Sequence, residues 1–170
     1  MPQAVLHILF TIIVLDLLRD YVLKDRKKLP LHYVFIGGIA GLIPDADIPL
    51  YWLLNKVLGI QVEWFHRTFT HSIFFPLAFL ALTFAAMALS RKKKVWLFFA
   101  VVTFGFTVHL LLDGILSGYI PLFYPFSTAG FGFNLSGKLG WPAFLEGLDA
   151  IILLVWLWDL DRRINLRDYL

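Results

Sequence analysis

Two aspartates, Asp45 and Asp47, lie one residue apart in the sequence IPDADIP, framed by Pro44 and Pro49. Proline ends helices and favours extended backbone before it, so we expect an extended turn on which both carboxylates reach one cation. A solvated turn uses the same residue types, and the motif alone does not separate the two interpretations. Carboxylates that lie close to other carboxylates need a counter-ion, however, and a metal ion supplies it.

Histidines occur in two further motifs, HRTFTHS with His66, Arg67 and His71, and HLLLDG with His109 and Asp113. The i, i+4 spacing in HLLLDG puts its two polar residues on one helix face. Ionisable groups within an apolar segment usually face a bundle interior or a cavity. The planar guanidinium of Arg67 suits a phosphate or a carboxylate. The alternatives are a His–Asp pair that only joins helices and a polar cap at the start of the next helix.

The remaining candidates lie near the ends of apolar segments. His7 is a lone imidazole, for which a hydrogen-bonded core histidine is the alternative; Asp149 is a further ligand candidate, and Glu146 could support the ligands or act as a base. The predicted metal ligands are His7, Asp45, Asp47, His66, His71, His109, Asp113 and Asp149, and the predicted catalytic residues are Asp47, Arg67 and Glu146.

This ligand set is larger than an open zinc site needs, because such a site has three protein ligands and a water. It suits two metal ions joined by a bridging carboxylate. Imidazole mixed with carboxylate favours zinc, or manganese, over magnesium and calcium. The chain has no cysteine, which excludes disulfides and thiolate metal sites.

The elements that must position these residues are apolar. The chain of 170 residues is 59% hydrophobic and 16% charged, which leaves more apolar surface than one soluble core buries. We therefore predict an all-α, polytopic membrane bundle that forms one domain over residues 1–170, with about five transmembrane segments of which the second is short. These segments are Ala4–Tyr21, Leu31–Ile43, Ser72–Ser90, Val95–Leu116 and Trp141–Trp158.

Basic residues gather in three places, Lys24–Lys28, Arg91–Lys94 and Arg162–Arg167, all on one predicted side of the bundle. The positive-inside rule then predicts an outside N-terminus, a cytoplasmic C-terminus and a multi-pass protein of the inner (plasma) membrane whose site faces the non-cytoplasmic side. Because the net charge of +3 comes from clusters at helix ends, we expect no nucleic-acid partner.

Residue counts from the predicted inner ends place the polar side chains in one layer. His7, Asp45 and His109 each lie about 21 Å above the cytoplasmic boundary, at about 1.5 Å per helical residue. Asp149 lies at nearly the same level, and His71 marks the outer start of its segment. The five segments are therefore expected to bring histidine and aspartate together near the outer face.

The motifs IPDADIP, HRTFTHS, HLLLDG and YPFS, in this order on a small multi-span chain, resemble the YdjM-type family of membrane-bound metal-dependent hydrolases. Some members are described as LexA-binding, inner-membrane-associated hydrolases. The resemblance runs from His7 to Asp149 and implies a membrane-embedded, metal-binding hydrolase. Its matched positions are Asp45 and Asp47, His66 with Arg67, His71, His109, Asp113 and an early helical histidine at His7. A remoter similarity to zinc-dependent phospholipases C and nucleases would make phosphoesters the substrate class.

The expected function is hydrolysis of a phosphoester, on a lipid or lipid-linked head group, by a metal-activated water at the outer face. The alternatives are a protein that binds or transports metal ions or protons, and a non-catalytic membrane adaptor with a structural metal. A single polar layer argues against a conduit, since no polar chain continues to the other face. The aromatic, glycine-rich loop 117–142 is expected to form a lid over an acyl chain or an interfacial cover.

Overall fold

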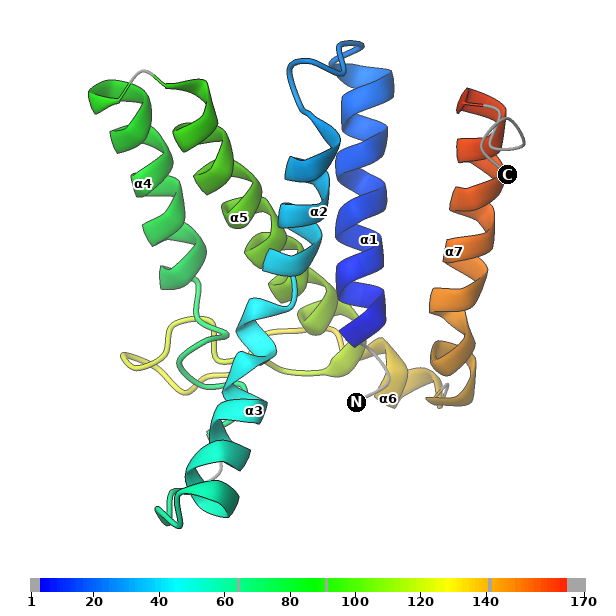
Figure 1. Ribbon diagram of the computed structural model, residues 1–170. Coiled ribbons are helices and arrows are strands. Elements are labelled where there is room, and N and C mark those ends of the chain that lie inside the picture. The colour runs from blue at the N-terminus through cyan, green and yellow to red at the C-terminus, as the bar shows by residue number, and fades with distance from the viewer. Residues whose placement is uncertain (1–3, 64, 91, 141, 165–170) are drawn as a thin grey trace.

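The computed structural model describes residues 4–63, 65–90, 92–140 and 142–164, and within these ranges the protein is helical (Figure 1). Its only β contact there is an isolated bridge between Ile120 and Phe131. The all-α prediction is confirmed. The helices are α1 (Ala4–Leu17), α2 (Leu31–Ala40), α3 (Asp47–Trp52), α4 (Phe74–Leu89), α5 (Lys93–Leu112), α6 (Leu135–Leu139) and α7 (Pro142–Ile164).

Helices α1, α2, α4 and α5 stand side by side and form the core of the bundle (Figure 1). The contact between α2 and α5 depends on small residues. A Cβ atom on Gly105 would collide with the carbonyl oxygen of Gly37 and would lie 2.8 Å from the backbone nitrogen of Gly41. Such residues let apolar helices approach closely. Buried Val34 and Phe106 fill the space on either side of this crossing.

The described residues of the three basic segments share one end of the bundle, the upper end in Figure 1. There the Nζ atom of Lys93 donates a hydrogen bond to the carbonyl oxygen of Lys27 at 2.8 Å, and Arg163 contacts Asp20 at 2.7 Å. The loops before α4 and after α5 lie at the opposite end. The chain therefore separates a basic end from a loop-rich end, while the side of the membrane that each end faces stays a prediction.

Among the described residues, one helical segment, Lys93–Leu116, is long and apolar enough to cross a membrane. A second span would require α2 and the helical stretch Ile43–Val57, which meet at a 47° bend, to act together. Helix α4 has 16 residues, or about 24 Å, against a hydrocarbon core of about 30 Å. The five-span prediction is therefore not confirmed.

The proline-framed segment differs from its prediction. Ile43–Ala46 forms a 3₁₀ turn that continues into α3, so the expectation of extended backbone is wrong. Pro44 and Pro49 fall in the first turns of these helical pieces, where a missing N–H group breaks no hydrogen bond. Because helical backbone turns Asp45 and Asp47 in different directions, the two carboxylates face opposite ring nitrogens of His71, Asp45 at Nε2 and Asp47 at Nδ1.

Helix α7 is joined to α1 mainly by polar contacts near the basic end. The guanidinium of Arg163 contacts the carboxylates of Asp16 at 2.6 Å and Asp20 at 2.7 Å. The indole N–H of Trp156 also donates to Asp16, at 3.1 Å. Large apolar side chains elsewhere on α7, such as Leu154, are exposed. The helix is held by charged groups that lie far from the loop-rich end.

Candidate metal centre

Four ligand atoms from three segments meet at the loop-rich end of α5. The Nε2 atoms of His71 and His109 lie 3.2 Å apart. The Oδ1 atom of Asp45 lies 3.5 Å from Nε2 of His71 and 3.6 Å from Nε2 of His109. The Oδ2 atom of Asp113 lies 3.4 Å from Nε2 of His71 and 3.8 Å from Nε2 of His109. The turn before α3, the loop before α4 and helix α5 thus aim their side chains at one point.

These separations are close to those of ligand atoms around one metal ion, and His71, His109 and Asp113 form one group whose ligand atoms lie within 4.8 Å of one another. Zinc bonds to nitrogen and oxygen of about 2.0–2.2 Å, at tetrahedral angles, place ligand atoms about 3.3–3.6 Å apart. The five measured separations range from 3.2 to 3.8 Å. Two imidazoles and two carboxylates are a donor set that zinc and manganese accept. The types of donor and their proximity therefore suit a divalent transition-metal ion.

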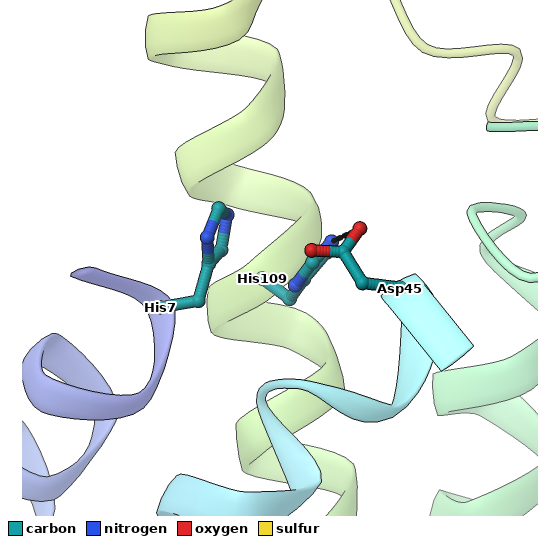
Figure 2. Close-up of side chains that lie close together, drawn as sticks. All are labelled: His7, Asp45 and His109. Carbon is teal, nitrogen blue, oxygen red and sulfur yellow. Dashed lines mark ion pairs between the residues drawn. The ribbon is translucent and has the colours of Figure 1, made fainter. Parts of the chain in front are cut away.

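Asp113 faces a second group with its other oxygen. Its Oδ1 atom lies 3.4 Å from Nε2 of His7 and 3.3 Å from Nη2 of Arg67. The ligand atoms of His7, Asp45 and His109 also lie within 4.8 Å of one another. Figure 2 shows His7, from α1, and Asp45 on opposite sides of His109. The two oxygens of Asp113 thus face different imidazoles, and Arg67 contacts both oxygens.

A backbone carbonyl fixes the orientation of His109. The carbonyl oxygen of Gly41 lies 2.7 Å from Nδ1 of His109 and can only accept, so Nδ1 carries the proton. This leaves Nε2 with a lone pair directed at the cluster, as in metal sites where a histidine donates its other N–H to a carbonyl. The contact exists because α2 and α5 approach closely at Gly105. Helix packing therefore determines which nitrogen is available.

Asp47 organises the HRTFTHS loop. Its Oδ1 atom accepts a hydrogen bond from Nδ1 of His66 at 3.0 Å. Its Oδ2 atom accepts from the hydroxyl of Thr70 at 2.9 Å and from the backbone N–H of Arg67 at 3.3 Å. Asp47 belongs to none of the three groups whose ligand atoms lie within 4.8 Å of one another. The structure thus places it behind His66 and His71.

Arg67 adopts a left-handed backbone conformation, with φ of 59°. Such conformations cost free energy in residues other than glycine and often occur at functional sites. Here the turn lets the backbone N–H of Arg67 reach Asp47, while its side chain contacts Asp113 through Nε at 3.2 Å and Nη2 at 3.3 Å. Its guanidinium thereby lies against the candidate metal centre.

The cluster is almost closed to solvent. His71 and His109 are 0% exposed, and His7 and Asp113 are 2% exposed. The side chains of Asp45 and Arg67 keep 12% and 27% of their surface accessible. Burial lowers the pKa of His71, but the neighbouring carboxylates of Asp113 and Asp45 raise it more, so the pKa lies above its usual value. Access to the centre is therefore from the side of Asp45 and Arg67.

The structure does not bring Asp149 to the site, and it does not describe the side chain of Glu146. Asp149 is on α7, where its carboxylate accepts the backbone N–H of Ala150 at 2.8 Å, and it belongs to none of the ligand groups found among the described residues. The side chain of Glu146 lies outside the described part of the chain. Their roles as ligand and base stay predictions.

Two contributors were not predicted as parts of the site. The hydroxyl of Thr70 lies 3.1 Å from Nδ1 of His71 as well as contacting Asp47, whereas its sequence position suggested only a helix cap. Its position directly before a candidate ligand was the available signal. The carbonyl of Gly41 acts through the backbone, and no residue type in the sequence signals that contact.

A helical fold with a membrane-competent segment and a buried histidine–aspartate cluster defines a membrane protein with a candidate metal centre. The chain belongs to the YdjM inner membrane protein family, whose sequence model matches residues 1–166. This confirms the resemblance that the motifs predicted and identifies an inner membrane protein. No curated protein and no solved structure matches the chain.

Proposed function

We propose that this protein is a metal-dependent hydrolase that cleaves a phosphoester of a lipid or a lipid-linked head group. One observation carries the proposal: ligand atoms of His71, His109 and Asp113 lie within 4.8 Å of one another, and an arginine fork contacts the same carboxylate of Asp113. A purely structural clip would need the ligands but not a partly exposed guanidinium beside them. A cation that binds anions next to a metal site is typical of phosphoryl chemistry.

The first ion would be held by His71, His109 and Asp113, with Asp45 within 3.6 Å of both imidazoles, and a second by His7 with the remaining oxygen of Asp113. Zinc suits this set best, and manganese is the other candidate. Bound ions would supply Lewis acidity and a water of lowered pKa.

The phosphate would bind at the accessible side, where Arg67 lies. Its guanidinium presents a fork of N–H donors, which matches two oxygens of a phosphate. The carboxylate of Asp113 offsets part of the charge of the guanidinium and fixes its orientation, with contacts to Nε at 3.2 Å and to Nη2 at 3.3 Å. Orientation by a fixed carboxylate reduces the rotamer freedom that a long side chain loses on binding.

We assign proton transfer to the pair formed by His66 and Asp47. The Nδ1–H of His66 donates to Asp47, which leaves Nε2 as a proton acceptor. The carboxylate fixes the tautomer and stabilises the imidazolium that forms, as in other histidine–carboxylate pairs. A ligand nitrogen of His66 lies within 4.8 Å of ligand atoms of Asp45 and His71. Asp47 thus contributes through His66 rather than taking the proton itself.

The test combines metal analysis with turnover. Purified protein in lipid nanodiscs is analysed by mass spectrometry for bound metals and assayed for release of phosphate or head group from phospholipids. We expect bound zinc or manganese, turnover that chelation removes, and loss of turnover with metal retained in His66→Gln. His32→Gln is the matched control, because His32 is exposed and lies outside the cluster.

Metal-loaded protein that turns over no phosphoester, but carries the ion across proteoliposomes, would overturn the hydrolase proposal and favour transport.

A further inference from the structure

An apolar groove of about 450 Å³ lies between α4, α5 and the loop that follows α5. Its floor includes the buried side chains of Leu110 and Ile120. Its rim includes Leu77 and Leu111, which are 48% and 57% exposed. The groove therefore opens on the apolar outer surface of the bundle and not into its interior.

The two polar side chains in this groove are already hydrogen-bonded. The hydroxyl of Thr103 donates to the carbonyl oxygen of Phe99, and that of Thr107 donates to the carbonyl of Thr103, both at 2.8 Å. Each donor is thus satisfied within α5, as expected for threonine in apolar helices. The lining consequently presents methyl and methylene groups, which suit a hydrocarbon and offer nothing to a polar ligand.

The groove has the length of one membrane leaflet. Along α5 and the helical turn that follows it, the lining runs from Thr103 to Ile115, which is about 18 Å at 1.5 Å per residue. The hydrocarbon core of a bilayer is about 30 Å thick, so the groove covers about half of it. It occupies the half of Lys93–Leu116 that is nearer to the metal centre.

Arg67 lies near one end of the groove, although it does not line the groove itself. Gly114 lines the groove and directly follows Asp113, the partner of Arg67. Gly132 also lines it, and a Cβ atom there would collide with the carbonyl oxygen of Gly118. Gly118 in turn lies beside Arg67, because a Cβ atom on Gly118 would lie 3.9 Å from Nη1 of Arg67. The guanidinium of Arg67 therefore lies near the end of the apolar groove that is closer to the metal centre.

We propose that this groove holds one acyl chain of the substrate, a phospholipid whose phosphate binds Arg67. The inference rests on the proposed function and narrows its substrate class to lipids with an acyl chain close to the phosphate. Charge complementarity determines the direction in which the lipid lies: the phosphate is at the guanidinium and the chain runs along α5 towards the middle of the bundle.

The groove orients the lipid more than it attracts it. A chain that moves from bilayer hydrocarbon to an apolar groove gains little, because lipid tails are as apolar as leucine. A short-chain lipid dissolved in water gains the full free energy of burying each methylene group, which lowers KM by up to about fourfold per methylene. Water-soluble substrates of increasing chain length thus report occupancy of the groove.

The binding test uses phosphatidic acid with a diazirine in the middle of one acyl chain, photolysed with the full-length protein in nanodiscs. We expect labelled peptides within 103–115 and 120–133, with labelling competed by unlabelled phosphatidic acid and much less by diacylglycerol of the same chains. Thr107→Trp, which fills the groove, should reduce this labelling several-fold. Leu82→Trp is the control, because Leu82 is an exposed α4 residue that does not line the groove.

Labelling spread over the apolar surface, or equal competition by diacylglycerol, would overturn the proposal. The kinetic test measures KM for monomeric phosphatidic acids of four to eight carbons: KM should fall with each methylene in the wild type and in Leu82→Trp, but not in Thr107→Trp. A wild-type KM that is independent of chain length would also overturn it. Because labelling requires no turnover, specific labelling without hydrolysis would contradict the proposed function and leave the lipid site standing.

Discussion

The substitution Asp113→Asn tests whether one carboxylate serves two metal ions. It keeps the size of the side chain but removes the charge that faces His71 and His109 on one oxygen and His7 on the other, at 3.4–3.8 Å. Removal of one partner from a buried charged contact costs about 3–5 kcal/mol, which weakens binding about 10²- to 10³-fold or more. At micromolar metal, both ions should be lost.

The assay is metal content per chain, measured by mass spectrometry after dialysis against micromolar zinc. We expect two ions in the wild type, one in His7→Ala and none in Asp113→Asn. His32→Ala should retain both, and circular dichroism of each variant verifies the helical fold. Equal losses in His7→Ala and Asp113→Asn would refute the shared carboxylate, and full metal content in Asp113→Asn would refute the site.

Three more predictions concern the surroundings of the ligands. Asp47→Asn should weaken metal binding 10- to 100-fold without abolishing it, as in other metal sites that lose a residue hydrogen-bonded to a ligand. Titration with a chromophoric chelator measures the metal affinity, and an unchanged affinity would contradict the prediction. Gly105→Val should push α2 away from α5 at the carbonyl of Gly37. This should lower the free energy of unfolding by about 1–3 kcal/mol and weaken metal binding through His109. Thermal melts with and without metal would show both effects, and a stability equal to that of the wild type would refute the packing argument. Metal affinity should fall as the pH falls through the raised pKa of His71. The reason is that the metal ion must displace a proton, which this imidazole retains to higher pH than usual. A metal affinity that is constant between pH 8 and pH 5 would contradict this prediction.

The position of the site could be predicted from the sequence because depth along a helix is a matter of counting residues. His7, Asp45 and His109 were expected in one layer, and the structure brings all three together within 4.8 Å. The i, i+4 spacing also predicted that His109 and Asp113 share a helix face, where their ligand atoms lie 3.8 Å apart. Regular secondary structure converts such spacings into geometry with little ambiguity.

The details that depend on irregular backbone could not be predicted. The 3₁₀ turn at Ile43–Ala46 directs Asp45 and Asp47 to opposite ring nitrogens of His71, whereas proline preferences suggested one shared cation. The left-handed conformation of Arg67 is maintained by tertiary contacts and not by its residue type. The polar residues late in α1 find their partner Arg163 more than a hundred residues later, a pairing that no local pattern reveals.

The attachment of α7 by charged groups has a consequence for how the protein is handled. A helix joined through Arg163, Asp16 and Asp20 is held most firmly where water and salt are excluded, because ion pairs weaken as the dielectric constant and ionic strength rise. Because these side chains are at most 11% exposed, dissolved salt reaches them little, whereas a detergent that admits water to them should loosen α7 before it disturbs the cluster around His109, to which α7 contributes no ligand among the described residues. Preparations that differ only in detergent would then share a metal content and differ in how readily a protease cleaves the loop before α7.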